Sequence, residues 1–159
     1  MMGLSGGGWT TTLAAALDPR IQLSLPVAGS VPCSFDHTSW DFEQFCSRPY
    51  NEACDYECQY VLASLEKERT SVQMIHEFDP CCFHAHGRHD AIRAYNKRVQ
   101  RQIQGHFETS ATVGNIHEVN HRDKIVAGML IDALDAHGVL SNESGLGHLP
   151  FNTLRRWGP

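Results

Sequence analysis

A serine flanked by glycines near the start of the chain has the spacing of a catalytic turn. Gly3, Ser5 and Gly7 form the pattern G-x-S-x-G. In such a turn a strand passes abruptly into a helix, and the serine is held in a strained backbone conformation with its hydroxyl exposed. A serine hydroxyl becomes a nucleophile when a neighbouring base accepts its proton. Ser5 is therefore a candidate nucleophile, and an ordinary serine in a glycine-rich loop is the alternative.

An acid and a histidine further along the chain have positions that would activate this serine. Asp79 follows a predicted strand over residues 71–76, and His117 lies in the loop after a predicted strand over residues 106–113. The carboxyl ends of parallel strands meet at one edge of a sheet, so the loops that follow them lie close together. A histidine there can take the proton of Ser5, and a carboxylate can orient the histidine.

Several other acids and histidines could fill the same roles. The alternative acids are Asp55, Glu77 and Asp90, and the alternative bases are His76, His106 and His121. Asp90 fits better as the N-cap of a predicted helix over residues 91–104, which Gly105 would end. Asp79 itself could be only a turn former before Pro80.

Strands and helices alternate along the chain. The predicted strands cover residues 21–28, 71–76 and 106–113, and the predicted helices cover residues 8–17, 56–65, 91–104 and 121–137. This alternation predicts an α/β protein, with a parallel sheet of about three strands, flanking helices and right-handed crossovers. On the first helix, Trp9, Leu13 and Leu17 form the expected apolar face.

The predicted domain covers residues 1–138 and contains an irregular segment over residues 30–69. This segment holds too many aromatic residues for a disordered linker. We expect it to be a helical excursion or lid that shapes a substrate pocket. Residues 139–159 are rich in glycine and proline and are predicted to be a loosely attached tail.

The strand that should lead into the turn at Ser5 has little sequence from which to form. Only Met1 and Met2 precede Gly3. We therefore expect this strand to be absent and the chain to be a fragment of a longer protein. Without it, the strand over residues 21–28 would form an uncovered sheet edge, through which the chain is expected to self-associate.

The composition argues against some classes of partner. The chain has 159 residues, of which 42% are hydrophobic and 19% charged, as expected for one globular domain. Its formal net charge is −5, and no basic patch dominates, which argues against nucleic acid as a partner. No apolar stretch has the length needed to span a membrane. The sequence does not indicate a compartment.

The six cysteines allow two interpretations. Cys46, Cys54 and Cys58 lie in one polar stretch and could pair there. Cys81 and Cys82 are adjacent, and a bond between neighbours in sequence is geometrically unfavourable. Reduced, partly buried thiols are the favoured interpretation.

A group of potential metal ligands follows directly after the candidate acid. Its members are Cys81, Cys82, His84, His86 and His89. Thiolate and imidazole suit zinc and other transition metals. So short a loop rarely aims four ligands at one tetrahedral centre, and we predict no bound metal and no cofactor. A metal-binding domain built on residues 81–89 is kept as an alternative function.

A resemblance to a known family rests on separate stretches of the chain. These are Gly3-Leu4-Ser5-Gly6-Gly7-Gly8-Trp9, Ala15-Ala16-Leu17-Asp18-Pro19-Arg20-Ile21, Phe78-Asp79-Pro80 and His117-Glu118-Val119-Asn120. Together they make residues 3–137 similar to the C-terminal half of an α/β-hydrolase. The branch that they resemble most is the acetyl-xylan-esterase and dienelactone-hydrolase-like one.

The resemblance implies roles for individual residues. Ser5 would be the nucleophile, Asp79 the acid and His117 the base of a triad, and the backbone N–H of Gly6 would donate to the oxyanion. It implies a serine hydrolase, a carboxylesterase that forms an acyl-enzyme on a small-molecule ester; a peptidase would use the same triad. The earlier strands of such a fold and the loop with the second oxyanion donor are absent. A non-catalytic remnant or interaction module is therefore the alternative.

Overall fold

The computed structural model describes residues 1–35, 46–119, 127–128 and 131. The chain divides into two units, Met1–Val119 and Asn120–Pro159, and the fold described below is that of the first. Apart from residues 127, 128 and 131, the predicted helix over residues 121–137 lies outside the described residues. The predicted tail and His121 lie outside them as well.

The first unit is built on a four-stranded parallel sheet whose strands follow one another in chain order. The strands are β1 (Met2–Leu4), β2 (Leu23–Val27), β3 (Thr70–His76) and β4 (His106–Thr112). Leu4 pairs with Val27, Val27 with Met74, and Met74 with Ser110, so all four strands end close to one level. The prediction of an α/β protein with a parallel sheet is confirmed.

The strand in front of Ser5 is present, contrary to the sequence prediction. β1 has only three residues, yet it pairs in parallel with β2, and Met2 lies opposite Leu25. The N-terminal amino group adds a 2.7 Å hydrogen bond to the carbonyl of Leu23. The sheet therefore has four strands rather than about three. The short β1 forms the edge, so the expected uncovered edge at residues 21–28 was wrong.

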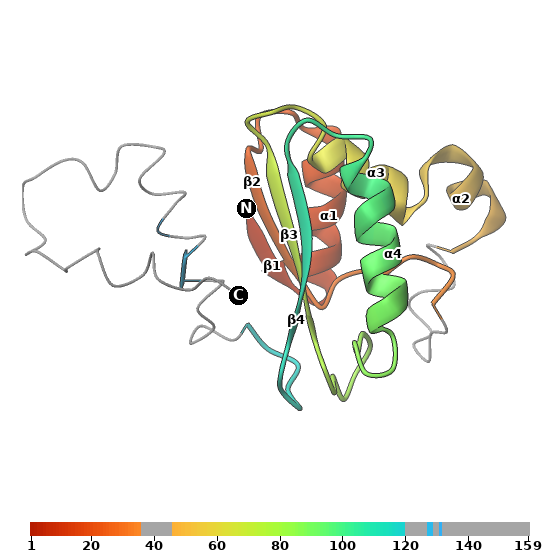
Figure 1. Ribbon diagram of the computed structural model, residues 1–159, viewed down its shortest axis with the longest axis vertical. Helices are drawn as coiled ribbons and strands as arrows, with labels where there is room; N and C mark the ends of the chain where they lie inside the picture. The colour runs from red at the N-terminus through yellow and green to blue at the C-terminus, as the bar shows by residue number, and fades with distance from the viewer. Residues whose placement is uncertain (36–45, 120–126, 129–130, 132–159) are drawn as a thin grey trace, which may run out of the picture. The chain divides into compact units, whose positions relative to one another are not determined.

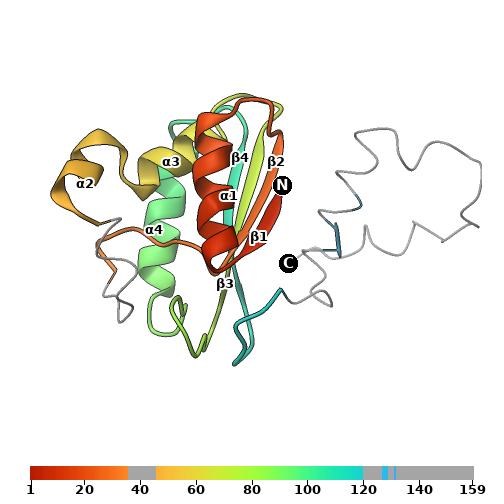
Figure 2. The ribbon, with the colours of Figure 1, turned by 180° about the vertical axis from the view of Figure 1, so that it is seen from behind.

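The helices that connect the strands lie on one face of the sheet, as Figure 1 and the reverse view in Figure 2 show. They are α1 (Gly6–Leu17), α2 (Arg48–Cys54), α3 (Tyr56–Ala63) and α4 (His89–Gln100). Right-handed crossovers between strands that follow in chain order place every connecting helix on the same side. Among the described helices, none is long and apolar enough to cross a membrane.

The buried face of α1 differs from the predicted one. Its buried residues are small or polar, namely Gly8, Thr11, Thr12 and Ala15. Leu17 is 78% exposed, so the predicted apolar face is wrong at this position. The hydroxyls of Thr11 and Thr12 donate to carbonyls one turn earlier, which satisfies them without water. Small side chains allow α1 to approach the sheet closely. The helix therefore buries its face of small residues instead of the predicted apolar face.

The core between α3, α4 and the sheet is aromatic. The rings of Tyr60 and Phe107 stack at 4.9 Å, and Tyr56, Tyr60 and Tyr95 are almost fully buried. The Tyr95 hydroxyl donates to Gln73 Oε1 at 2.7 Å, and burial raises the pKa of Tyr60 and Tyr95. The part of segment 30–69 that forms α3 therefore belongs to the core rather than to a lid. Residues 36–45 of that segment lie outside the described residues.

The cysteines are all paired, contrary to the favoured prediction. The pairs are Cys33–Cys46, Cys54–Cys58 and Cys81–Cys82. The first two have Cα–Cα separations of 5.5 and 5.3 Å, which suit a disulfide. No local pattern pairs Cys33 with Cys46, because 13 positions of sequence separate them.

Two predicted helix-end signals have other roles. Helix α4 begins at His89 with Arg88 as its N-cap, so Asp90 lies in the first turn, where it forms an ion pair with Arg93. Gly105 lies beyond the end of α4, and a Cβ there would overlap backbone carbonyls, including that of Arg69. Close approach of two chain segments, rather than helix termination, explains this glycine.

Candidate active site

Ser5 lies at the turn between β1 and α1 in a backbone conformation that L-residues rarely adopt. Its φ is 56° and its ψ is −121°. Its backbone N–H donates to Val27 at 2.9 Å, and its carbonyl accepts from Trp9 at 2.9 Å, so both neighbours fix the turn. Ser5 occupies the N-cap position of α1, but its side chain makes no capping hydrogen bond. The hydroxyl is therefore not used to cap the helix, which is the ordinary structural role of a serine at this place.

Glycines let the backbone close around this turn. A Cβ on Gly3 would overlap the carbonyl of Gly7, and a Cβ on Gly8 would overlap the carbonyl of Val27. Gly29, after β2, is in equally close contact with Gly8. A Cβ on Gly7, by contrast, would have no atom within 4 Å. The close approach thus depends on Gly3, Gly8 and Gly29, and the second glycine of the sequence pattern is not needed for it.

Gly6 follows Ser5 as the first residue of α1. The N–H groups of the first turn of a helix have no partner within the helix and point out of its N-terminus. The helix dipole adds partial positive charge at the same place. This position can therefore stabilise negative charge that develops beside Ser5.

Asp79 and His117 lie in contact, although 38 residues separate them. Pairing between β3 and β4 continues past the strand ends, because Glu77 N–H donates to Thr112 and Phe78 N–H donates to Gly114. The next residue after Phe78 is Asp79. His117 Nδ1 lies 2.8 Å from Asp79 Oδ2 and 3.0 Å from Oδ1. The continued pairing is what places the acid beside the histidine.

Backbone N–H groups hold the Asp79 carboxylate in place. Its side chain is fully buried, and Oδ1 accepts N–H bonds from Cys81 at 2.7 Å and Cys82 at 3.2 Å. The His117 side chain is 21% exposed. An ionised carboxylate only accepts hydrogen bonds, so His117 Nδ1–H donates to it, and Nε2 of the neutral ring keeps its lone pair. That tautomer is the one a general base needs.

His76 supports the loop that carries His117. Its Nε2–H donates to the carbonyl of Glu118 at 2.8 Å, and its Nδ1 lies 2.6 Å from Thr112 Oγ1. The ring is fully buried at the end of β3. His76 is an alternative base in the sequence, but both of its ring nitrogens have partners here. Its place beside Glu118 could not be predicted, because 42 residues separate the two.

The other candidate acids and bases have partners of their own. Asp55 caps α3 by accepting from Cys58 N–H at 2.8 Å. Glu77 lies 3.1 Å from His89 and 3.4 Å from His86. His106 lies 3.4 Å from Glu108 and is half exposed. Of the candidates that the structure describes, Asp79 and His117 are the acid and histidine in mutual contact.

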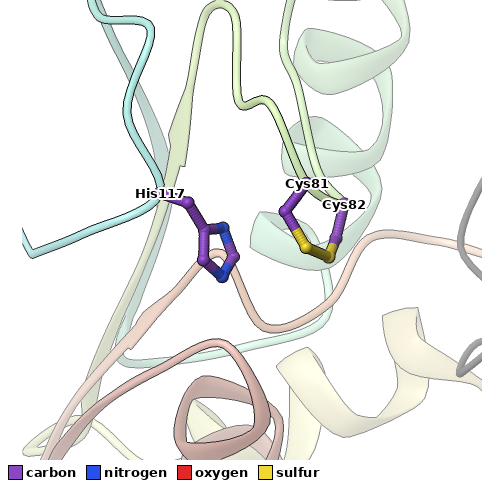
Figure 3. A group of neighbouring side chains, drawn as sticks. All are labelled: Cys81, Cys82 and His117. Atoms are coloured by element: carbon purple, nitrogen blue, oxygen red, sulfur yellow. A yellow bond between two sulfur atoms is a disulfide. The ribbon is translucent and has the colours of Figure 1, made fainter.

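Of the potential metal ligands over residues 81–89, two lie together with a residue from another loop. Among the described residues, the group whose ligand atoms lie within 4.8 Å of one another is Cys81, Cys82 and His117. Figure 3 shows the His117 ring and the Cys81–Cys82 disulfide pointing into the same space from different loops. His84 is not part of this group, and its Nδ1 is buried. A histidine from the loop after β4, rather than one of the three histidines in residues 81–89, lies beside the two cysteines.

The fold places the three candidate residues at one edge of the sheet. The first unit is a parallel four-stranded sheet with flanking helices, which is an α/β architecture. Ser5 follows β1, Asp79 follows β3 and His117 follows β4, so all three lie beyond the carboxyl edge of one sheet.

The chain is similar to the structure of Est1E from Butyrivibrio proteoclasticus with bound ferulic acid, with a TM-score of 0.47 and 17% sequence identity. The match covers 85% of this chain and 58% of the Est1E chain. This chain thus spans less than two thirds of the length of that protein. No protein-family model and no curated protein matches it.

Proposed function

We propose that this chain carries the catalytic residues of a serine hydrolase that acts on a carboxylic ester. The observation that carries the proposal is the contact between His117 Nδ1 and the buried carboxylate of Asp79 at 2.8 Å. The positive φ of Ser5, and its hydroxyl that makes no helix-capping hydrogen bond at the same sheet edge, support it. The small-molecule ester as substrate class rests on the family resemblance of the sequence.

In the proposed mechanism the three residues act in sequence. Ser5 Oγ attacks the ester carbonyl, and His117 Nε2 accepts its proton. Asp79 holds the imidazole in the required tautomer and stabilises the imidazolium that forms. His117 then returns the proton to the leaving alcohol, and water releases the acyl group from Ser5 by the same steps.

The oxyanion of the tetrahedral intermediate would lie at the start of α1. The backbone N–H of Gly6 is the proposed donor, assisted by the helix dipole. Such a site usually has a second donor, and losing one donor typically lowers turnover ~10²–10³-fold. Covalent labelling of Ser5 reports on the nucleophile directly, because it needs no turnover.

Labelling with a fluorophosphonate, followed by intact mass measurement, tests the proposal. The wild-type chain should gain one adduct, and Ser5→Ala should gain none. Ser47→Ala is the matched control, because Ser47 is an exposed N-cap serine without a side-chain capping bond, and it should label like wild type. Circular dichroism and size-exclusion chromatography would establish that each variant is folded.

The outcomes separate the proposal from its alternative. An adduct that depends on Ser5 supports the nucleophile, and profiling on acetyl and longer acyl esters then defines the acyl preference. A folded chain that takes no label, or that labels equally in Ser5→Ala, overturns the proposal. The chain would then be a non-catalytic member of its fold class.

A further inference from the structure

The sulfur atoms of Cys81 and Cys82 lie beside the proposed base, and the proposed mechanism gives them no role. Only the backbone N–H groups of these residues contact Asp79. Their Sγ atoms and a ring nitrogen of His117 all lie within 4.8 Å of one another. Cys81 is exposed, and Cys82 and His117 are half-buried, so a small ion can reach all three. The arrangement is compact, accessible and rich in soft ligands.

The spacing suits a tetrahedral ion once the disulfide is opened. Zinc binds thiolate sulfur at about 2.3 Å and imidazole nitrogen at about 2.0–2.1 Å. A tetrahedral centre with these bond lengths holds its ligand atoms about 3.5–3.8 Å apart. In the disulfide the two sulfurs are closer together than this, so they must separate on reduction, and a ring nitrogen of His117 already lies within 4.8 Å of both. Two sulfurs and one nitrogen leave the fourth position for water.

We propose that the reduced Cys81–Cys82 pair and His117 form a site for a thiophilic divalent cation of the zinc(II) type. A dithiol reductant opens the site: its two sulfurs join in a disulfide, two electrons pass to the Cys81–Cys82 bond, and each cysteine gains a proton. The cation then replaces the two thiol protons, which pass to solvent. While the disulfide is intact, no thiolate is available and the site does not form.

Binding at this site would compete with hydrolysis, a consequence that rests on the proposed function. His117 Nδ1 is bonded to Asp79, and Nε2 carries the lone pair proposed to accept the Ser5 proton. A cation on Nδ1 would displace the carboxylate, and a cation on Nε2 would occupy the lone pair. Either mode stops His117 from acting as the base. The site would thus make the proposed activity sensitive to both thiols and metal.

Cobalt(II) titration of the full chain tests the site directly, because tetrahedral thiolate coordination has a distinctive visible spectrum. The chain is first reduced with a phosphine, which ends as its oxide by taking oxygen from water, and zinc(II) is then used to displace the cobalt. We expect one cobalt per chain at the 81–82 site. The Cys81→Ser/Cys82→Ser variant should lose that spectrum. His117→Gln should weaken binding at least by the ~10–100-fold that loss of an outer partner of a metal site costs.

Two matched variants test whether binding is specific to the 81–82 site. Cys54→Ser/Cys58→Ser removes a different disulfide and should leave the spectrum of the 81–82 site intact. Ser5→Ala removes the proposed nucleophile and should bind cobalt like wild type, so failure of the hydrolase proposal is distinguishable from failure of the metal site. Equal binding by the oxidised chain, equal affinity in His117→Gln, or a spectrum retained in Cys81→Ser/Cys82→Ser would each overturn the proposal.

Discussion

The turn at Ser5 and the pair formed by Asp79 and His117 are held by different forces. At Ser5 backbone contacts hold the turn, namely the hydrogen bond to Val27 and the close approach of Gly8 to β2. At the acid and histidine, side chains contact each other across 38 residues of sequence. The first region depends on the absence of side-chain atoms, and the second depends on particular side-chain atoms.

This difference predicts how the two regions respond to substitution. A change that adds atoms to the glycines around Ser5 disturbs the packing of β1, α1 and β2, so its effect is on stability. A substitution that removes the charge of Asp79 but keeps its shape can leave the fold intact, because the backbone N–H groups around it can still donate to the new side chain. Its effect should be on catalysis.

The largest expected effect is the loss of activity in Asp79→Asn. The asparagine oxygen can still accept from Cys81 and Cys82, but the side chain loses the charge that is proposed to stabilise the His117 imidazolium. We expect kcat to fall by ~10⁴-fold, the size typical of this change in a triad, and thermal stability to stay near that of wild type. Ester hydrolysis and calorimetry measure the two quantities. Unchanged kcat would remove Asp79 from the mechanism.

The next effect separates two adjacent glycines. Gly8→Ala places a methyl group against the Val27 carbonyl and should lower the free energy of unfolding by ~1–3 kcal/mol. Gly7→Ala enters open space in a helix and should be neutral or stabilising by ~0.5–1 kcal/mol. Urea unfolding of the two variants checks this contrast. Equal effects would show that close approach at Gly8 does not hold the turn.

The smallest effect concerns strain at Ser5 itself. Ser5→Gly removes a residue with a φ of 56° and replaces it with one that adopts this conformation freely. Since the side chain makes no capping bond, we expect a net stabilisation of ~1 kcal/mol, with Ser5→Ala close to wild type. Thermal unfolding measures both. A glycine variant less stable than the alanine variant would mean that the turn is not strained.

Local patterns determined the elements of this fold. The predicted strand over residues 71–76 matches β3, because apolar residues are concentrated there and the segment pairs on both sides. Ile92, Tyr95 and Val99 are buried in α4 as their helical spacing predicts. The alternation of strands and helices was enough to predict a parallel sheet. The G-x-S-x-G spacing was enough to predict a sharp turn at Ser5, although it pointed to Gly7 rather than Gly8.

Only the tertiary structure decided the features that depend on distant contacts. Three residues suffice for β1 because β2 is already in place to pair with them, which no local pattern reveals. Small residues of α1 face the sheet because Gly8 and Gly29 let the helix approach it. The contact of His117 with Asp79, and the sulfurs of Cys81 and Cys82 beside it, arise because pairing between β3 and β4 continues past the strand ends. Sequence specifies such contacts only through the whole fold, because each joins residues that no local conformation brings together.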